Sequence, residues 1–274
     1  MNTVYRPDKS FGQHFLIDSH IADRIVDCAG ILPEDTVLEI GPGKGILTGR
    51  LLERARQVIA VEIDRNLLEF LKEKFKGRTG FGVVAADILK VDFEVLFTGV
   101  HSRVKVVSNI PYNISTPIVE LLCRNRARFA EAVLMVQREV AQRLLSGPGT
   151  KQYGLTTLNL ALCAHGRTVM TVKPDVFEPP PEVMSSVISL VFSPDMRYHL
   201  ESEEIFHTVT GVAFRQRRKM LKNTVIPYMI SCGITETDAF NLFSSLDVDP
   251  LSRPETVGVG EFVKLSNAIS VALA

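Results

Sequence analysis

The chain of 274 residues is poor in cysteine, and its cysteines are scattered. They form neither a CxxC pair nor a cluster with histidine; they are Cys28, Cys123, Cys163 and Cys232. This spacing suggests neither a zinc site nor a disulfide framework. We therefore expect reduced, buried cysteines, a cytoplasmic protein and no bound metal.

Long apolar runs are also lacking. No run approaches the roughly 18 residues of a membrane-spanning helix, and the polar N-terminus, residues 1–9, has no apolar core of an export signal. Hydrophobic residues make up 46% of the chain and charged residues 23%, as in ordinary globular proteins. At this length we expect one large domain and one small one.

Net charge is absent as well, because 31 lysines and arginines balance 31 acidic residues. This balance argues against a protein that coats nucleic acid nonspecifically. One segment departs from it, with five cations and no acid among them: Arg215, Arg217, Arg218, Lys219 and Lys222. The segment favours a docking surface for structured RNA, and a solvated helix face is the alternative.

Apolar strand-like segments alternate with helical segments over most of the chain. The strand candidates are residues 36–40, 58–63, 81–85, 104–108 and 132–136, and the helix candidates are residues 46–55, 65–75 and 116–125. This alternation predicts a mostly parallel sheet with helices on both faces. Residues 169–172 and 186–192 could close the sheet as an antiparallel pair. Beyond residue 193 only helical patterns remain, so we place a large domain at 1–194 and a small all-α domain at 195–274.

A glycine-rich loop, Gly41-Pro42-Gly43-Lys44-Gly45, follows the first strand candidate. Ligands of parallel sheets bind at the carboxyl ends of the strands, and glycine lets the backbone approach them closely. A dinucleotide fingerprint would need a third glycine at position 46, which is Ile46. The GxGxG spacing after Glu39 instead resembles motif I of the class I S-adenosylmethionine-dependent methyltransferases.

Acidic residues follow the next two strand candidates. Glu62 could accept hydrogen bonds from both ribose hydroxyls of the cofactor, and Asp87 could accept from its adenine amino group. Ile63 and Ile88 would flank the adenine ring. Either acid taken singly is better explained as a helix N-cap or a surface carboxylate, but the two acids together with the glycine loop favour a cofactor site.

The segment Asn109-Ile110-Pro111-Tyr112 suits the alkylation of a nucleobase amino group. Such a nitrogen is a poor nucleophile, because its lone pair is delocalised into the ring. The Asn109 side chain and the next backbone carbonyl could accept both of its N–H bonds, so that the nitrogen rehybridises as it attacks. Pro111 lacks an N–H group and stiffens the turn, and Tyr112 offers a flat face to an extruded base. Read alone, the segment is also an ordinary turn after a buried strand.

Residues 10–16, Ser-Phe-Gly-Gln-His-Phe-Leu, resemble the N-terminal motif of the KsgA/Erm family of ribosomal RNA adenine N6-dimethyltransferases. Residues 177–185, Phe-Glu-Pro-Pro-Pro-Glu-Val-Met-Ser, are similar to the family's FxPxPxVxS loop, and all the motifs occur in the family's order. The resemblance implies that Phe177 stacks on the target adenine opposite Tyr112. The cofactor contacts that it implies are His14, Leu16, Gly41, Gly43, Glu62, Ile63, Asp87, Ile88 and Asn109. Many members carry asparagine at the position of His14.

The resemblance implies a class I methyltransferase (Rossmann-like) domain and a small helical domain that docks on rRNA. We expect dimethylation by S-adenosyl-L-methionine of N6 of two adjacent adenosines near the 3′ end of 16S small-subunit rRNA during ribosome biogenesis. The cationic segment resembles the KsgA branch more than the Erm branch. We expect a monomer that binds the small-subunit precursor and no membrane. The sulfonium already activates the methyl group, so the reaction needs no metal.

Three alternatives stay open. The first is an Erm-type methyltransferase of 23S rRNA, and the second is a DNA adenine methyltransferase, since N-x-P-Y motifs serve there too. The third is a non-catalytic RNA-binding assembly factor, against which the complete set of motif residues argues.

Overall fold

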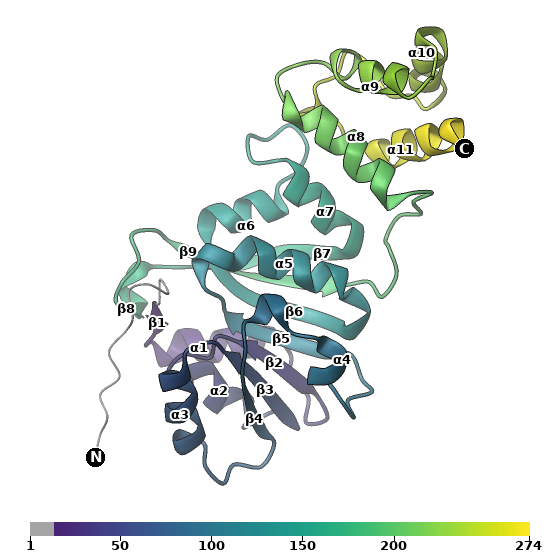
Figure 1. Ribbon diagram of the computed structural model, residues 1–274. Helices are drawn as coiled ribbons and strands as arrows, with labels where there is room; N and C mark the ends of the chain where they lie inside the picture. The colour runs from purple at the N-terminus through teal and green to yellow at the C-terminus, as the bar shows by residue number, and fades with distance from the viewer. Residues whose placement is uncertain (1–13) are drawn as a thin grey trace. The chain divides into compact units, whose positions relative to one another are not determined.

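The computed structural model describes residues 14–274, which form two compact units (Figure 1). Unit 1 runs to Ala141 and resumes at Cys163–Asp195, and unit 2 comprises Gln142–Leu162 and Met196–Ala274. The predicted division between residues 194 and 195 lies one residue from the last of these boundaries. No local pattern indicates that residues 142–162 belong with the later helices, because their apolar residues meet their partners through contacts that are distant in the sequence.

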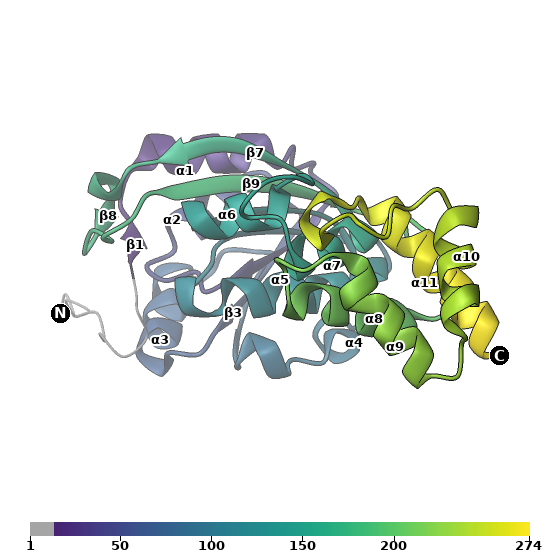
Figure 2. The same cartoon turned by 90° about the horizontal axis from the view of Figure 1, so that it is seen from above.

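Unit 1 is built on a seven-stranded sheet with the order β4-β3-β2-β5-β6-β9-β7. Its strands are β2 (Thr36–Ile40), β3 (Gln57–Glu62), β4 (Phe81–Ala85), β5 (Val104–Asn109), β6 (Phe129–Gln137), β7 (Ala164–Val172) and β9 (Ser185–Phe192). The first five strands in this order are parallel, and β9 pairs antiparallel with both β6 and β7. Figure 2 shows β7 and β9 side by side. The expected mostly parallel sheet and its antiparallel pair are confirmed.

The strand order reverses at the middle of this sheet. β3 and β4 are added successively on one side of β2, whereas the next strand, β5, pairs with the opposite edge of β2. The connections after β2 and β5 therefore lead away from each other. In open α/β sheets this reversal leaves a crevice at the carboxyl ends of the two strands, where ligands bind.

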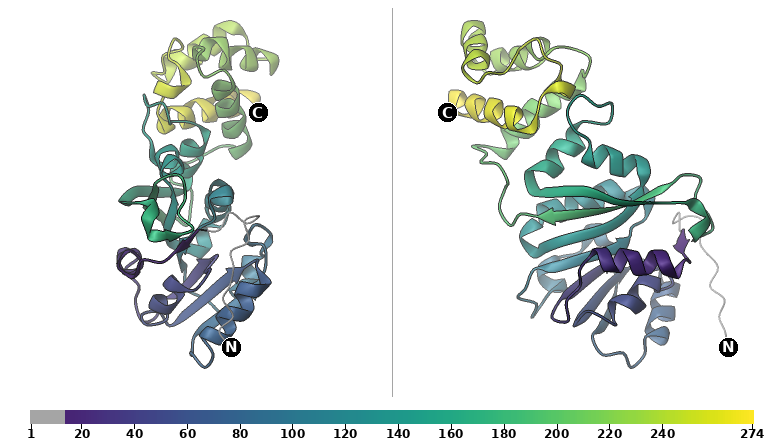
Figure 3. Two further views of the ribbon diagram at one scale, coloured as in Figure 1. Left: turned by 90° about the vertical axis from the view of Figure 1, so that its left-hand side faces the viewer. Right: turned by 180° about the vertical axis from the view of Figure 1, so that it is seen from behind.

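Helices cover the sheet on both faces. Those that begin in unit 1 are α1 (Ser19–Cys28), α2 (Ile46–Leu51), α3 (Arg65–Lys74), α4 (Phe93–Leu96), α5 (Ser115–Arg124) and α6 (Arg138–Leu145). Figure 3 shows α1 on the face opposite to that of α5. The side chain of Asp64 accepts from the backbone N–H groups of Asn66 and Leu67, which confirms it as the N-cap of α3. The predicted helix 46–55 ends earlier, at Leu51.

The face of the sheet that carries α1 and α2 is packed with aliphatic side chains. Ile25 and Leu51 from the helices meet Val58 and Val107 from the strands, all of them inaccessible to solvent. Burying one such side chain contributes roughly 1.5–3 kcal/mol to folding. Apolar residues on both faces of the parallel strands explain why these strands appear in the sequence as continuous apolar runs.

Unit 1 also contains a two-stranded sheet, which pairs the start of the described chain with the segment between β7 and β9. β1 (Phe15–Leu16) pairs antiparallel with β8 (Phe177–Glu178), with Phe15 opposite Glu178 and Leu16 opposite Phe177. Strands of two residues give no periodic signal, so neither was predicted. The pairing brings the N-terminal motif to the proline-rich loop, although residues 10–13 of that motif lie outside the described part of the chain.

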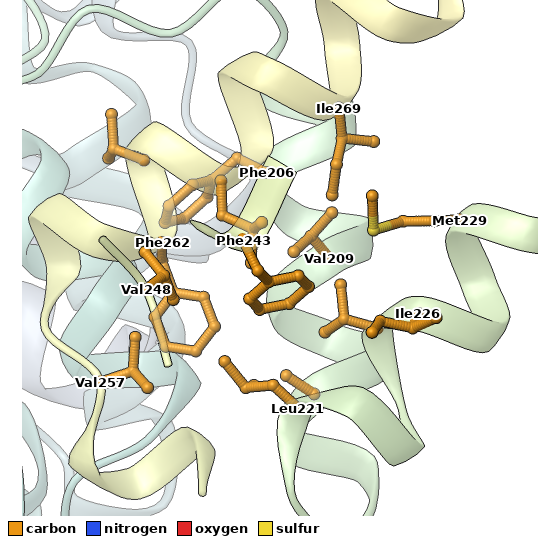
Figure 4. Packing of buried hydrophobic residues seen from close by; sticks show 14 of the residues in the cluster. Phe206, Val209, Leu221, Ile226, Met229, Phe243, Val248, Val257, Phe262 and Ile269 are labelled. Atoms are coloured by element: carbon orange, nitrogen blue, oxygen red, sulfur yellow. The ribbon is translucent and has the colours of Figure 1, made fainter. Parts of the chain in front are cut away.

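Unit 2 is helical, and its residues 196–274 contain no strand. Its helices are α7 (Leu155–Cys163, of which Cys163 is counted in unit 1), α8 (Glu203–Arg215), α9 (Val225–Ser231), α10 (Glu236–Ser245) and α11 (Val259–Leu273). Phe206, Phe243 and Phe262 are fully buried at its centre, where Figure 4 shows apolar side chains pointing toward one another. Across residues 14–274, no helix combines the length and the apolar character that crossing a membrane requires.

Arg217 connects residues 142–162 to the rest of unit 2 by hydrogen bonds. Its Nε donates to the Glu255 carboxylate at 2.6 Å, and its two terminal nitrogens donate to the carbonyls of Lys151 and Thr150 at 2.6 and 2.8 Å. A guanidinium that donates to three groups of the same unit helps to hold that unit together. Arg217 was predicted to lie on an RNA-docking surface, but these bonds leave it little hydrogen-bonding capacity for RNA.

We expect Arg217→Ala to destabilise unit 2 by roughly 1–2 kcal/mol, the usual value of charge-assisted hydrogen bonds that are partly exposed. Arg218→Ala, at the neighbouring exposed position, is the matched control and should have little effect. Urea denaturation of the full chain measures both. Equal unfolding midpoints for the two variants would show that the Arg217 contacts do not stabilise the unit.

Candidate active site

A cavity of about 260 Å³ lies at the carboxyl ends of the parallel strands of unit 1. The predicted site residues in its wall are His14, Leu16, Gly41, Gly43, Glu62, Ile63, Asp87, Asn109, Ile110, Pro111 and Tyr112. They come from β1 and the residue before it, from the last residues of β3 and β5, and from the loops that follow β2, β3, β4 and β5. The sheet thus brings together motifs that are far apart in the sequence, at the crevice that the strand order creates.

The glycine loop needs glycine at two positions for steric reasons. Gly43 has a φ of +56°, and a Cβ atom there would lie 2.8 Å from the Phe15 ring. Gly45 has a φ of +75°, and its Cβ would lie 2.7 Å from the Phe75 ring. Any larger residue would be strained and would clash. The loop therefore packs closely between β1 and the end of α3.

Two lysines connect the same loop to neighbouring elements. The Lys44 ammonium pairs with Glu178 at 3.1 Å and lies 5.1 Å from the centre of the Phe15 ring. Lys74 donates from α3 to the carbonyl of Lys44 at 2.7 Å. No role was predicted for either lysine, because their partners belong to β8 and to the loop itself.

Glu62 is 5% exposed, and its carboxylate is held by backbone donors. Its Oε1 accepts from Ile63 at 2.9 Å and from Asp64 at 3.0 Å. Burial raises the pKa of Glu62, and hydrogen bonds from the N–H groups of Asp64, Gly43 and Ile63 counteract this rise. These donors favour the ionised carboxylate, which is the form that accepts from a ligand hydroxyl.

Glu39 is a second buried acid, which accepts a hydrogen bond from the Thr48 hydroxyl at 2.6 Å. Burial raises the pKa of Glu39 to about 8, and the neighbouring Glu62 adds to the rise, whereas the Thr48 bonds and Lys74 oppose it. Glu39, Glu62 and Asp87 all line the cavity, and among the described lining residues Lys44 is the one lysine or arginine. Such a wall suits a cationic ligand better than a pyrophosphate.

Two roles were predicted for Asp87, a helix N-cap and a cofactor ligand, and its position in the structure is compatible with both. Its side chain accepts from the Leu89 N–H at 3.1 Å and so caps a short 3-10 helix, yet it also lines the cavity. Ile63 lines the cavity and is 52% exposed, but Ile88 is 4% exposed and is not in the wall. Leu89 takes the expected place of Ile88 there, because the helical turn after Asp87 directs Ile88 into the interior.

Asn109 presents an acceptor that lacks a donor. Its Nδ2 donates to the main-chain carbonyl of His14 at 3.2 Å, which orients the amide. Its Oδ1 is buried and meets no hydrogen-bond donor from residues 14–274. An unpaired buried acceptor costs roughly 1–3 kcal/mol, which is recovered only when a ligand donates to it.

Tyr112 is oriented by contacts at its hydroxyl and on its ring. The hydroxyl shares a hydrogen bond with Ser185, and the ring stacks on the His14 ring with centroids 5.6 Å apart and planes 26° apart. Burial raises the pKa of Tyr112, and the Ser185 bond opposes this. Ser185 is the last residue of the FxPxPxVxS motif, but no separate function was predicted for it.

Phe177 does not reach the cavity. It is 3% exposed and packs in the apolar core of unit 1 with Leu16, because its pairing in β8 directs alternate side chains to opposite faces. The structure thus does not bring Phe177 and Tyr112 together as a sandwich for a base. His14 occupies the face of Tyr112 instead.

The remaining cations of the basic segment belong to unit 2. Arg215, Arg218 and Lys219 are exposed and Lys222 is half-buried. Within residues 14–274 none of these four forms an ion pair, in contrast to Arg217. Also within that range, no group of three or more histidine, cysteine or acidic side chains is placed to hold a metal ion.

We expect Glu39→Gln to change how stability depends on pH. Glu39 keeps its proton up to a pH of about 8 in the fold, against an ordinary pKa of 4.5. Its stabilising contribution is therefore present below about pH 4.5 and is lost as the pH rises through about 8, by at most roughly 1.4 kcal/mol per pH unit. Glutamine stays neutral, so the variant should gain stability over the wild type between pH 5 and 9.

Urea denaturation at several pH values measures this difference, and Glu53→Gln, at an exposed acid of the same unit, is the control. Parallel stability profiles of wild type and Glu39→Gln would mean that Glu39 ionises normally.

Comparisons with known proteins bear on this site. The profile of the family described as "Ribosomal RNA adenine dimethylase" matches residues 5–258. The Ribosomal RNA small subunit methyltransferase A of Moorella thermoacetica is 41% identical over 270 residues, which covers 96% of this chain and 92% of that protein.

Two solved structures resemble the chain over nearly its whole length. A dimethyladenosine transferase from Plasmodium falciparum has a TM-score of 0.79 and 28% identity, covering 92% of this chain and 96% of the other. The 23S rRNA methyltransferase ErmE has a TM-score of 0.71 and 25% identity, covering 92% and 98%. Both support the predicted class I methyltransferase fold. With its family profile matched over most of its length, the chain belongs to the ribosomal RNA adenine dimethylase family.

Proposed function

We propose that this protein dimethylates N6 of two adjacent adenosines near the 3′ end of small-subunit (16S) rRNA, with S-adenosylmethionine as the methyl donor, during ribosome biogenesis. The observation that carries the proposal is the buried Oδ1 of Asn109, an oriented acceptor without a donor at the cavity wall. An amino group has the N–H bonds that such an acceptor lacks.

The residues of the cavity fit the cofactor. Gly43 lines the cavity without a side chain, Glu62 offers a carboxylate to ribose hydroxyls, and Ile63 offers an exposed apolar surface to adenine. When bound, S-adenosylmethionine supplies a methyl group that its sulfonium already makes electrophilic. The carboxylate of Glu62, which backbone N–H groups support, matches the positive charge of that ligand.

The chain itself contributes position and hydrogen-bond acceptors. The Oδ1 of Asn109 and the carbonyl of Ile110 would accept the two amino N–H bonds, which returns the lone pair to the nitrogen. Tyr112 would hold the extruded base by stacking. Fixing a nucleophile against its electrophile in this way can supply most of the acceleration. No general base is needed, because the methylated nitrogen is cationic and loses its proton readily.

The relative from Moorella thermoacetica supports the small-subunit substrate over the large-subunit one. The protein of Moorella thermoacetica is named for the small subunit and is more similar than ErmE, which is named for 23S rRNA. The unpaired acceptor of Asn109 favours an enzyme over a non-catalytic assembly factor. We further propose a cytoplasmic monomer. Methylation of undermethylated small-subunit particles, 23S rRNA and DNA by the purified protein separates the remaining alternatives.

Asn109→Ala should lower the rate of methyl transfer by about 10²–10³, the usual effect of removing a hydrogen-bonding group that acts in the transition state. Cofactor affinity should change by no more than a few-fold, since the acceptor faces the base. Rates on small-subunit particles and calorimetric titration with S-adenosylmethionine test the two parts. Asn125→Ala is the control, because Asn125 also donates to a backbone carbonyl, at 2.9 Å, but outside the cavity. Near-normal turnover of Asn109→Ala would refute the assignment.

We propose that Arg215, Arg218 and Lys219 contact rRNA phosphates, since these cations are exposed and unpaired in the described chain. Replacing all three by alanine should weaken binding to particles and reduce the slope of log affinity against log salt by roughly 0.9 per lost contact. Cofactor affinity should not change. Lys264→Ala, at an exposed cation of α11, is the control for a loss of charge elsewhere in the same unit. An unchanged salt slope in the triple variant would leave these cations as a solvated face.

A further inference from the structure

The face of Tyr112 that the proposed function offers to a base is covered by a side chain of this protein. The His14 and Tyr112 rings are stacked, 5.6 Å apart between centroids and with planes 26° apart. The His14 Nδ1 also makes a hydrogen bond to the Pro179 carbonyl at 2.8 Å. A planar, nitrogen-containing ring thus lies where an extruded adenine would stack.

The main chain at the same position serves the other half of the proposed base site. The carbonyl of His14 accepts from Asn109 Nδ2 at 3.2 Å and thereby directs the Asn109 Oδ1 acceptor. The pairing of Phe15 with Glu178 holds the backbone immediately after His14, and the ion pair of Lys44 with Glu178 fixes β8 against the glycine loop. The backbone is therefore restrained from both strands, whereas within residues 14–274 the contacts that hold the side chain are one stack and one hydrogen bond.

We propose that the His14 side chain is an internal competitor of the target base for Tyr112, while the His14 carbonyl is a fixed support for Asn109. This inference rests on the proposed function, because it takes Tyr112 as the stacking surface. Before a base binds, the imidazole shields the face of Tyr112 from water. For a base to stack, the imidazole rotates away and the backbone stays in place, so that Asn109 keeps its orientation.

The competition has a measurable consequence. If only a fraction of molecules has an open Tyr112 face, the apparent affinity for the base is reduced by that fraction. One ring pair and one hydrogen bond favour the covered state by a factor of roughly 3–10. A variant without a ring at position 14 has no such competitor, and its backbone carbonyl is unchanged.

His14→Asn and His14→Ala should therefore each lower KM for undermethylated small-subunit particles by roughly 3–10-fold. The affinity for S-adenosylmethionine should stay within twofold of the wild type, which also shows that the variants are folded. His20→Asn, at an exposed histidine of α1, is the matched control and should leave both quantities unchanged. In a Tyr112→Leu background, which lacks the aromatic face, His14→Asn should no longer change the affinity for particles. A merely structural role of His14 would not produce this dependence on Tyr112.

An unchanged or increased KM in both ringless variants would overturn the inference and leave the proposed function intact, provided that the wild type methylates the particles. A loss of cofactor affinity without a lower KM would place the His14 side chain in the cofactor site and would overturn it as well. A wild-type protein that does not methylate small-subunit particles would overturn the proposed function, and this inference with it.

Discussion

The site depends on one constraint, the reversal of strand order between β2 and β5. Because these strands are parallel neighbours whose connections lead apart, no backbone crosses between their carboxyl ends, and a crevice remains there. Four of the five parallel strands, β2, β3, β4 and β5, then each deliver one motif to the same edge: the glycine loop, Glu62, Asp87 and Asn109. Residues separated by long stretches of chain meet without any of the loops having to be long.

The sheet alone does not complete the site, because Asn109 needs a partner to fix its amide. That partner is the carbonyl of His14, which the two-residue pairing of β1 with β8 holds in place. The same pairing puts Glu178 within reach of Lys44 on the glycine loop. A small antiparallel contact thus links the glycine loop, Asn109 and the proline-rich loop. The unpaired Oδ1 of Asn109 is a local cost in stability that a structural turn would have no reason to keep.

The sequence was sufficient for features that depend on local patterns. Continuous apolar runs identified the parallel strands, and Asp64 was identified correctly as a helix N-cap. Features set by distant contacts were missed. Phe177 was expected at the base but is buried by the pairing of β8, and Arg217 and Arg218, adjacent and chemically alike, differ because only Arg217 meets Glu255. The type of a residue determines which contacts its side chain can form, whereas its neighbours in the fold determine which contacts it has already formed.

The two buried acids of the cavity show how different hydrogen-bond donors can give identical side chains different protonation states. Backbone N–H groups of Asp64, Gly43 and Ile63 support the charge on Glu62, whereas Glu39 is fully buried and receives hydrogen bonds from Thr48 alone. Neighbouring buried carboxylates resist being ionised together, so the proton stays on Glu39. The charge on Glu62 would attract a cationic ligand in the cavity and repel an anionic one. The distribution of hydrogen-bond donors therefore makes the cavity selective for positive charge before any ligand contact is formed, which agrees with a sulfonium methyl donor.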